Sequence, residues 1–320
     1  LSLHNNTTAS NNTAVGHEAL YTSTTASTNT AIGYRAAKST TTGSSNVVMG
    51  AIAFHDNTTG HSNVALGYGA AYSNTSATYN TATGLYAGYS NSTGTHNSYY
   101  GGYAGYYQLG INNVAIGYGS LIGASGGSST GGANTAVGRD ALASNTTASD
   151  NTAVGFQALL SNTTATSNTA VGQRALENNS TGGLNTALGR EALKYNTTAA
   201  ANTAVGYQAA YNTTTGTQNV VMGRGAMHSN TTGSHNVAVG YEALVNNTSS
   251  SYLTAVGYQS LYSNTTGYAL VGVGWEALYS NTTGTFNTAV GRQALRSGTT
   301  ATYNTAVGYD AGQAVTTGVN

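Results

Sequence analysis

Hydrophobic and polar positions repeat along this chain with a period of 17 residues. The pentamer Asn-Thr-Ala-Val-Gly, with small variations, occurs in 18 copies. The copies begin at Asn12, Asn29, Asn46, Asn63, Asn80, Asn97, Asn113, Asn134, Asn151, Asn168, Asn185, Asn202, Asn219, Asn236, Leu253, Leu270, Asn287 and Asn304. Successive copies are 17 residues apart, except for a step of 16 after Asn97 and a step of 21 after Asn113. A fixed period of this kind indicates an array in which each repeat is one structural unit.

The consensus unit is Asn-Thr-Ala-Val-Gly-Tyr-Gln-Ala-Leu-Tyr-Ser-Asn-Thr-Thr-Gly-Thr-x, numbered here from position 1 to position 17. It is too short for a pair of helices or a leucine-rich repeat. It predicts an all-β chain, a β-solenoid of about 18 tandem coils with two short strands joined by turns in each coil. We expect residues 1–320 to form a single continuous array.

Alternation along a strand assigns the residues to faces. Position 4 is apolar in nearly every copy, as in Val15, Ile32 and Val137, so positions 2 and 4 are expected to face the core. Position 3 is nearly always Ala, and such a face of small residues would allow another chain to approach closely. Leu at position 9, such as Leu142, is expected to complete the apolar interior.

Position 5 is Gly in all copies, which predicts a corner. Such a corner needs either a positive φ or a backbone approach too close for a side chain. The corner glycines include Gly16, Gly33, Gly138, Gly155, Gly172, Gly206, Gly291 and Gly308. The repeated Thr-Gly near position 15 predicts the second corner.

Residues 97–133 depart from the repeat. Tyr99 and Tyr100 replace small residues of the predicted core, and 124–132 contain an insertion of four residues. One interpretation is a degenerate coil with a surface loop. The other is a protruding contact loop, because insertions in repeat arrays fall on one exposed face.

Position 12 is Asn in eleven copies, and two interpretations apply to them. Stacked amides can form a hydrogen-bonded ladder along the axis. Most of these residues also lie in Asn-x-Ser/Thr sequons in a predicted turn, which suggests N-glycosylation. The residues are Asn57, Asn74, Asn91, Asn145, Asn162, Asn179, Asn196, Asn230, Asn247, Asn264 and Asn281.

Position 6 follows the corner glycine and is often aromatic or Arg. Aromatic side chains there are expected either to stack or pack between chains, or to form a stripe that binds sugar or protein. Tyr207, Tyr241, Tyr258 and Trp275 are the candidate contact residues of this stripe.

Composition narrows the functional classes. Only 6% of residues are charged, with 9 basic and 9 acidic side chains, so there is no electrostatic footprint for nucleic acid. No apolar stretch is long enough for a membrane helix. The seven His are scattered over the repeat and have no metal-ligand spacing. Carboxylates such as Glu18, Asp140 and Glu276 fall at position 7, where we expect them to be exposed and rarely paired. We therefore predict no catalytic, metal or cofactor site and no enzymatic activity.

The unit Asn-[Thr/Val]-Ala-[Val/Ile]-Gly-Tyr-x-[Ala/Ser]-[Leu/Ala] resembles the head repeats of trimeric autotransporter adhesins over nearly the whole chain. It is also similar to repeats of some bacteriophage tail fibres. The resemblance implies a left-handed β-roll in which three parallel chains form one homotrimeric rod. The adhesin repeat is usually shorter, so each coil here has a longer outer turn.

These observations lead to three functional interpretations. The first is a non-catalytic shaft of an extracellular fibre or filament, whose partner is itself, as a homotrimer or an end-to-end homopolymer. Neither end carries a charged or irregular cap, so we expect a segment of a longer fibre or a subunit that stacks. The second is an adhesin head or virion tail fibre that binds a surface glycan or receptor. The third is an ice-binding solenoid, suggested by Thr-x-Thr patterns such as 283–285.

Overall fold

The protein is all-β, with short parallel strands in a regular series. The computed structural model describes residues 1–124 and 129–318. These residues form 18 strands of three residues each and contain no helix. They belong to two compact units, residues 1–164 and 165–320. Each unit is described below by itself.

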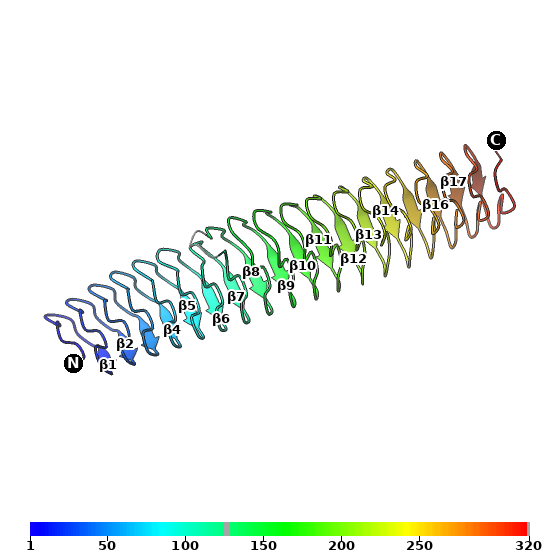
Figure 1. The fold of residues 1–320 in the computed structure, drawn as a ribbon. Coiled ribbons are helices and arrows are strands. Elements are labelled where there is room, and N and C mark those ends of the chain that lie inside the picture. Colours follow the sequence, from blue (N-terminus) through cyan, green and yellow to red (C-terminus); the bar gives the residue numbers. More distant parts are fainter. Residues whose placement is uncertain (125–128, 319–320) are drawn as a thin grey trace. The chain divides into compact units, whose positions relative to one another are not determined.

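Each unit contains nine strands, one for each copy of the pentamer (Figure 1). In residues 1–164 they are β1 (Thr13–Val15), β2 (Thr30–Ile32), β3 (Val47–Met49), β4 (Val64–Leu66), β5 (Thr81–Thr83), β6 (Ser98–Tyr100), β7 (Val114–Ile116), β8 (Thr135–Val137) and β9 (Thr152–Val154). In residues 165–320 they are β10 (Thr169–Val171), β11 (Thr186–Leu188), β12 (Thr203–Val205), β13 (Val220–Met222), β14 (Val237–Val239), β15 (Thr254–Val256), β16 (Val271–Val273), β17 (Thr288–Val290) and β18 (Thr305–Val307).

Strands that follow one another in each unit pair in parallel, with equivalent residues opposite each other. Thr13 lies opposite Thr30, and Thr186 lies opposite Thr203. The steps of 16 and 21 residues keep this register, because Val114 pairs with Ser98 on one side and with Thr135 on the other. This arrangement confirms the β-solenoid. Each coil contains one strand, at positions 2–4, and the expected second strand is replaced by turns.

The core of each coil is built from positions 3, 8 and 9. Ala153, Ala158 and Leu159 occupy these positions in one coil and have no exposed surface. Phe54 and Met227 replace Leu at position 9 and are equally buried. The prediction for Leu at position 9 is therefore confirmed, and the interior is narrow enough that a methyl group fills it at positions 3 and 8.

Positions 2 and 4 face away from this core, so the predicted face assignment is wrong. Val15, Met49 and Val307 at position 4 are 56%, 48% and 71% exposed. The alternation itself is correct, because position 3 lies on the opposite face of the same strand. The reversal has a steric reason: Ala at positions 3 and 8 and Leu at position 9 already fill the interior. Ala at position 3 is consequently not a surface for another chain.

In most coils three residues have a left-handed backbone without being glycine, at positions 7, 9 and 17; in the other coils glycine takes position 7 or position 9. Gln208, Ala210 and Gln218 have φ of 54°, 52° and 58°. This conformation costs roughly 1–2 kcal/mol for a residue with a side chain. The strained residues are tied to neighbouring coils: Gln208 N–H donates to the Arg190 carbonyl (3.0 Å) and Ala210 N–H to the Ala226 carbonyl (3.0 Å). Stacking therefore offsets the strain of a coil that would not hold its shape alone.

The corner glycines at position 5 have a positive φ, and most of them, though not Gly308, also lie too close to the next coil for a side chain. Gly206 has a φ of 133°, and a Cβ on it would lie 2.7 Å from the Gly223 carbonyl oxygen of the next coil. All eight predicted corner glycines have φ between 128° and 139°. The second corner, at position 15, needs no positive φ, and Ala199 and Ala301 replace Gly there and are buried. Where Gly is present, as at Gly216, a Cβ would overlap the Gly233 carbonyl oxygen of the next coil.

Candidate functional site

The eleven Asn at position 12 form a buried ladder. None of them is more than 2% exposed. Asn247 Nδ2 donates to Asn230 Oδ1 (3.0 Å) and to the Ser250 carbonyl (3.2 Å), and Asn281 Nδ2 donates to Asn264 Oδ1 (3.0 Å). The structure thus favours the ladder over glycosylation. A glycan is attached through Nδ2, and in the folded chain this atom lies in the interior and is used as a donor.

Asn at position 1 forms a second ladder, which the sequence interpretation missed. The Asn46 N–H donates to Asn29 Oδ1 (2.9 Å), and Asn46 Nδ2 donates to the Gly60 carbonyl (3.0 Å). That carbonyl also accepts from Asn57 Nδ2 of the first ladder (3.2 Å). The signal in the sequence was Asn in every copy except those that begin with Leu253 and Leu270.

Glutamates at position 7 are paired with neighbouring coils, contrary to the prediction, whereas Asp140 pairs with Arg139 of its own coil at 3.2 Å. Glu276 accepts hydrogen bonds from Gln293 Nε2 (3.0 Å) and Arg296 Nε (2.6 Å). Glu191 accepts from Gln208 Nε2 (2.8 Å). Both Glu side chains are mostly buried. Glu and Gln therefore alternate as a hydrogen-bonded pair from one coil to the next, and the carboxylates serve stacking.

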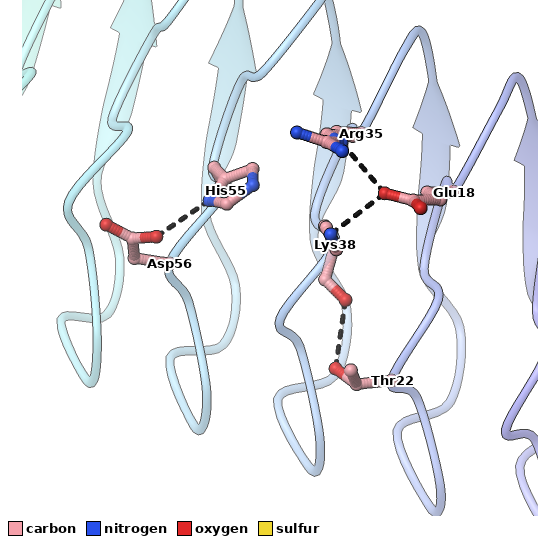
Figure 2. A network of polar contacts seen from close by, with 6 residues as sticks. All are labelled: Glu18, Thr22, Arg35, Lys38, His55 and Asp56. Carbon is pink, nitrogen blue, oxygen red and sulfur yellow. Dashed lines mark hydrogen bonds and ion pairs between the residues drawn. The ribbon is translucent and has the colours of Figure 1, made fainter.

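Figure 2 shows the corresponding contact in residues 1–164, where Glu18 lies between two cations. Its Oε2 is 2.8 Å from Arg35 Nε and 2.8 Å from Lys38 Nζ. The hydrogen bond from Lys38 is the main cause of a lowered pKa of the Glu18 carboxyl, and Arg35 adds to it against the opposing effect of burial. Nearby, His55 Nδ1 lies 2.7 Å from Asp56 Oδ1. The Glu18 carboxylate is thus held in an ion pair with both cations of the next coil.

An exposed column of aromatic and Arg side chains runs along position 6 of residues 165–320. We call it the position-6 column. It consists of Arg190, Tyr207, Arg224, Tyr241, Tyr258, Trp275, Arg292 and Tyr309. The rings of Tyr241 and Tyr258 stack with centroids 5.3 Å apart and planes at 8°. Arg292 lies over Trp275 at 4.6 Å and over Tyr309 at 5.1 Å.

Stacking in the position-6 column covers the ring faces. Tyr258 has Tyr241 on one side and Trp275 on the other, at 5.3 and 6.2 Å. A sugar that stacks on an aromatic ring needs an uncovered face, so the central rings cannot act as flat platforms. The structure supports the stacking interpretation of Tyr207, Tyr241, Tyr258 and Trp275.

A second aromatic network, in residues 1–164, was not predicted. Tyr72, Tyr89 and Tyr106 stack at position 10 with centroids 5.1 and 4.9 Å apart. Tyr86 and Tyr103 at position 7 contact the same rings. The signal in the sequence was Tyr or His recurring at position 10 in successive coils.

The irregular coil holds a buried aromatic residue. Tyr99 at position 3 is 1% exposed, and burial raises the pKa of its phenol far above the usual range. Of the insertion at 124–132, residues 125–128 lie outside the described part of the chain. Ser129 is buried and forms a parallel bridge with Gln108, which is at position 12 of the preceding coil, and its Oγ donates to the Asn145 carbonyl (3.0 Å). The contact-loop interpretation stays a prediction.

The outward face of the strands, positions 2 and 4, is uncharged, with an apolar residue at position 4 in nearly every copy and Thr, Ser or Val at position 2. We call it the strand face. No charged residue occurs at either position in any copy. Its most exposed apolar members are Val15, Val47, Met49, Tyr100, Ile116, Leu188, Val220, Met222, Val290 and Val307. Nine strands spaced by about 4.8 Å and about 10 Å long give each unit a strand face of about 400 Å².

The described residues contain neither a metal site nor a helix that could span a membrane. Within 1–124 and 129–318, no three His or carboxylate side chains come together as a metal site. The same residues include no helix that could span a membrane. Thr283 and Thr285 lie outside the strands, and the ice-binding interpretation stays a prediction.

In comparisons with known proteins, no family model matches the chain and no curated protein is significantly similar to it.

Proposed function

We propose that this chain is the shaft of an extracellular fibre, in which several copies pack side by side through their strand faces. The protein acts as a non-catalytic structural component. Its regular coils carry their polar groups in ladders that serve stacking, and its strand face is left for a partner.

The exposed strand face is the observation that carries this proposal. Parallel sheets are normally covered on both faces. Here the inner face is covered by the coil itself, while Val220 and Met222 on the outer face remain 42% and 45% exposed. The exposed apolar side chains of position 4 follow one another along the sheet of each unit, and contiguous exposed apolar surface of this kind often marks an interaction site. A second copy of the same chain provides a matching apolar face.

We propose a parallel homotrimer as the assembly, following the resemblance to trimeric autotransporter adhesins. Each copy would turn its strand face toward a common axis, with residues such as Val239 in the shared core. The extracellular location and the role as a cell-surface or virion fibre rest on the same resemblance.

Sedimentation velocity of the purified chain tests this proposal. We expect three times the mass of one chain. Met222→Glu combined with Val239→Glu would place carboxylates in the shared core, where unpaired charges cost several kcal/mol, and we expect single chains. The matched control, Thr232→Glu with Ser249→Glu, places the same charges on exposed turns of the same coils and should leave the assembly intact. A wild-type chain that sediments as a monomer would contradict the proposal.

A further inference from the structure

The Glu–Gln pairs at position 7 are interrupted once within residues 168–320. Gln208 donates to Glu191 (2.8 Å), and Gln259 donates to Glu242 (2.9 Å). The coil between these two pairs carries Gly225 at position 7. A side chain is therefore missing from a row that is otherwise filled by long polar residues.

The gap at Gly225 is open, unlike the gaps at two other position-7 glycines. At Gly69, a Cβ would lie 2.6 Å from the ring of Tyr86, and at Gly119 it would lie 2.8 Å from Asp140 Oδ1. Neighbouring side chains fill both of those gaps. At Gly225 the nearest atom to such a Cβ is Glu242 Cγ at 3.5 Å.

The open gap forms a hollow with a volume of about 240 Å³. Polar side chains line it on several sides: Gln208, Arg224, His228 and Glu242. Tyr207 and Val245 add apolar surface. We call this hollow the Gly225 pocket. It lies wholly within residues 165–320.

Arg224 is held in place without a carboxylate partner. Its guanidinium lies 5.9 Å from the Tyr207 ring centroid and 5.5 Å from that of Tyr241, and Nη1 donates to the Tyr241 hydroxyl (3.3 Å). Among the described residues, none forms an ion pair with Arg224. Most of its five N–H donors therefore remain for a ligand, while the rings restrict its motion.

The negative charge of Glu242 balances the positive charge of Arg224 in the pocket. Glu242 accepts from Gln259 through Oε2 (2.9 Å), and a carboxylate has further lone pairs available. His228 stacks on Tyr211 with centroids 4.9 Å apart, and partial burial lowers its pKa, which favours the neutral imidazole. The Gly225 pocket thus carries one positive and one negative charge and offers both donors and acceptors.

We propose that the Gly225 pocket binds a neutral monosaccharide unit of a glycan. Sugar hydroxyls both donate and accept, which matches a lining of guanidinium, carboxylate, amide and imidazole. The C–H groups of a sugar ring suit the Val245 side chain. The volume lies below the roughly 300–1,000 Å³ of pockets for drug-sized ligands, so it fits one ring. This inference goes beyond the proposed shaft and does not depend on it.

Saturation-transfer NMR with the full chain tests the proposal, using D-glucose, D-galactose, D-mannose and N-acetyl-D-glucosamine as separate probes. We expect at least one of them to receive saturation from the protein. Gly225→Gln fills the pocket with the residue found at position 7 of neighbouring coils and should abolish that signal. Arg224→Tyr keeps the stack of the position-6 column but removes the guanidinium, and should weaken binding by about tenfold or more.

Arg292→Tyr is the matched control, because Arg292 belongs to the same column but not to the pocket. It should leave the signal unchanged. The proposal is overturned if no probe receives saturation, if Gly225→Gln binds as the wild type does, or if Arg292→Tyr loses binding equally. Sedimentation of each variant separates this result from assembly: a trimer without sugar binding contradicts only the pocket, and a monomer that binds sugar contradicts only the shaft.

Discussion

Tyr99 occupies the space that Gly105, six residues later in the same coil, leaves free. A Cβ on Gly105 would overlap the Tyr99 ring, and a Cβ on Gly88 in the preceding coil would lie 2.8 Å from it. Both glycines stand at position 9, where most coils have Leu. The large residue at position 3 is thus compensated by two missing side chains, and the irregular coil keeps a filled core.

A double-mutant cycle tests this compensation. Gly105→Leu alone should lower the free energy of unfolding by about 1–3 kcal/mol, since it overpacks the core. Tyr99→Ala alone should lower it by about 3–5 kcal/mol by leaving a cavity. Together they restore the usual Ala and Leu, so the combined loss should be smaller than the sum by about 1–3 kcal/mol. Urea unfolding measures all four proteins, and additive losses would show that the two sites are independent.

The Tyr99 hydroxyl gives a second prediction. It is buried and has no hydrogen-bond partner among the described residues. Leaving a buried hydroxyl without a partner costs about 1–3 kcal/mol. We expect Tyr99→Phe to raise the free energy of unfolding by about 1 kcal/mol, measured by urea unfolding. Tyr106→Phe, at a partly exposed ring, serves as the control and should change little. A less stable Tyr99→Phe variant would mean that the hydroxyl has a partner.

Gly206 and Gly308 allow the cost of backbone strain to be measured apart from the cost of steric contact with the next coil. Gly206 and Gly308 have nearly equal φ, 133° and 129°. A Cβ on Gly206 meets the Gly223 carbonyl oxygen at 2.7 Å, whereas a Cβ on Gly308 meets only the Ala311 methyl group at 3.9 Å. Gly308→Ala should therefore cost only the strain, about 1–3 kcal/mol. Gly206→Ala should cost more, because the coils must also move apart. Thermal unfolding compares the two, and equal losses would argue against the crowding.

Stability should fall in acid partly through Glu276. Burial acts to raise the pKa of this carboxyl, but hydrogen bonds from Arg296 and Gln293 outweigh it and hold the pKa below 4.5. Since the folded-state pKa is lower than that of the unfolded chain, the contribution is present above pH 4.5 and is lost as the pH falls through the folded-state pKa.

Melting temperatures of the wild type and of Glu276→Gln from pH 7 to pH 3 measure this effect. We expect the advantage of the wild type to shrink below pH 4.5. Arg296→Met removes a partner at 2.6 Å and should move the loss to higher pH. A difference between wild type and Glu276→Gln that stays constant with pH would count against the ion pair.

The sequence predicted the coil but not which face of the strand is inside. The sequence pattern predicts the 17-residue period, the corner at Gly206 and the burial of Leu159. Each of these features depends on the size of a side chain or on the backbone freedom of glycine. Val at position 4 was assigned to the core because it is more hydrophobic than Ala. That choice ignored the volume of the interior, which Leu159 and Ala158 already fill. A rule based on hydrophobicity alone cannot detect that an apolar residue is exposed when smaller residues already fill the interior.

The candidate sites were harder to predict, because they depend on what neighbouring coils place together. Asn247 looked like a glycosylation site because its sequon is local, whereas its burial depends on Asn230 one coil away. Gln208 and Glu191 form a pair only after the coils stack. The left-handed backbone at Gln208 has no signal in the residue type, since Gln has no preference for that conformation.

The register of the strands has a consequence for folding and for chain length. Every strand pair within a unit joins residues 16, 17 or 21 apart, as in Ser98 with Val114 and Thr13 with Thr30. The loop that must close to pair a new strand is therefore about as long for the last coil as for the first. Proteins rich in contacts between residues close in sequence fold quickly. Adding a coil lengthens the sheet without lengthening the conformational search. Duplication or loss of one 17-residue segment in the gene would change the number of strands and leave each remaining strand paired with its usual partner.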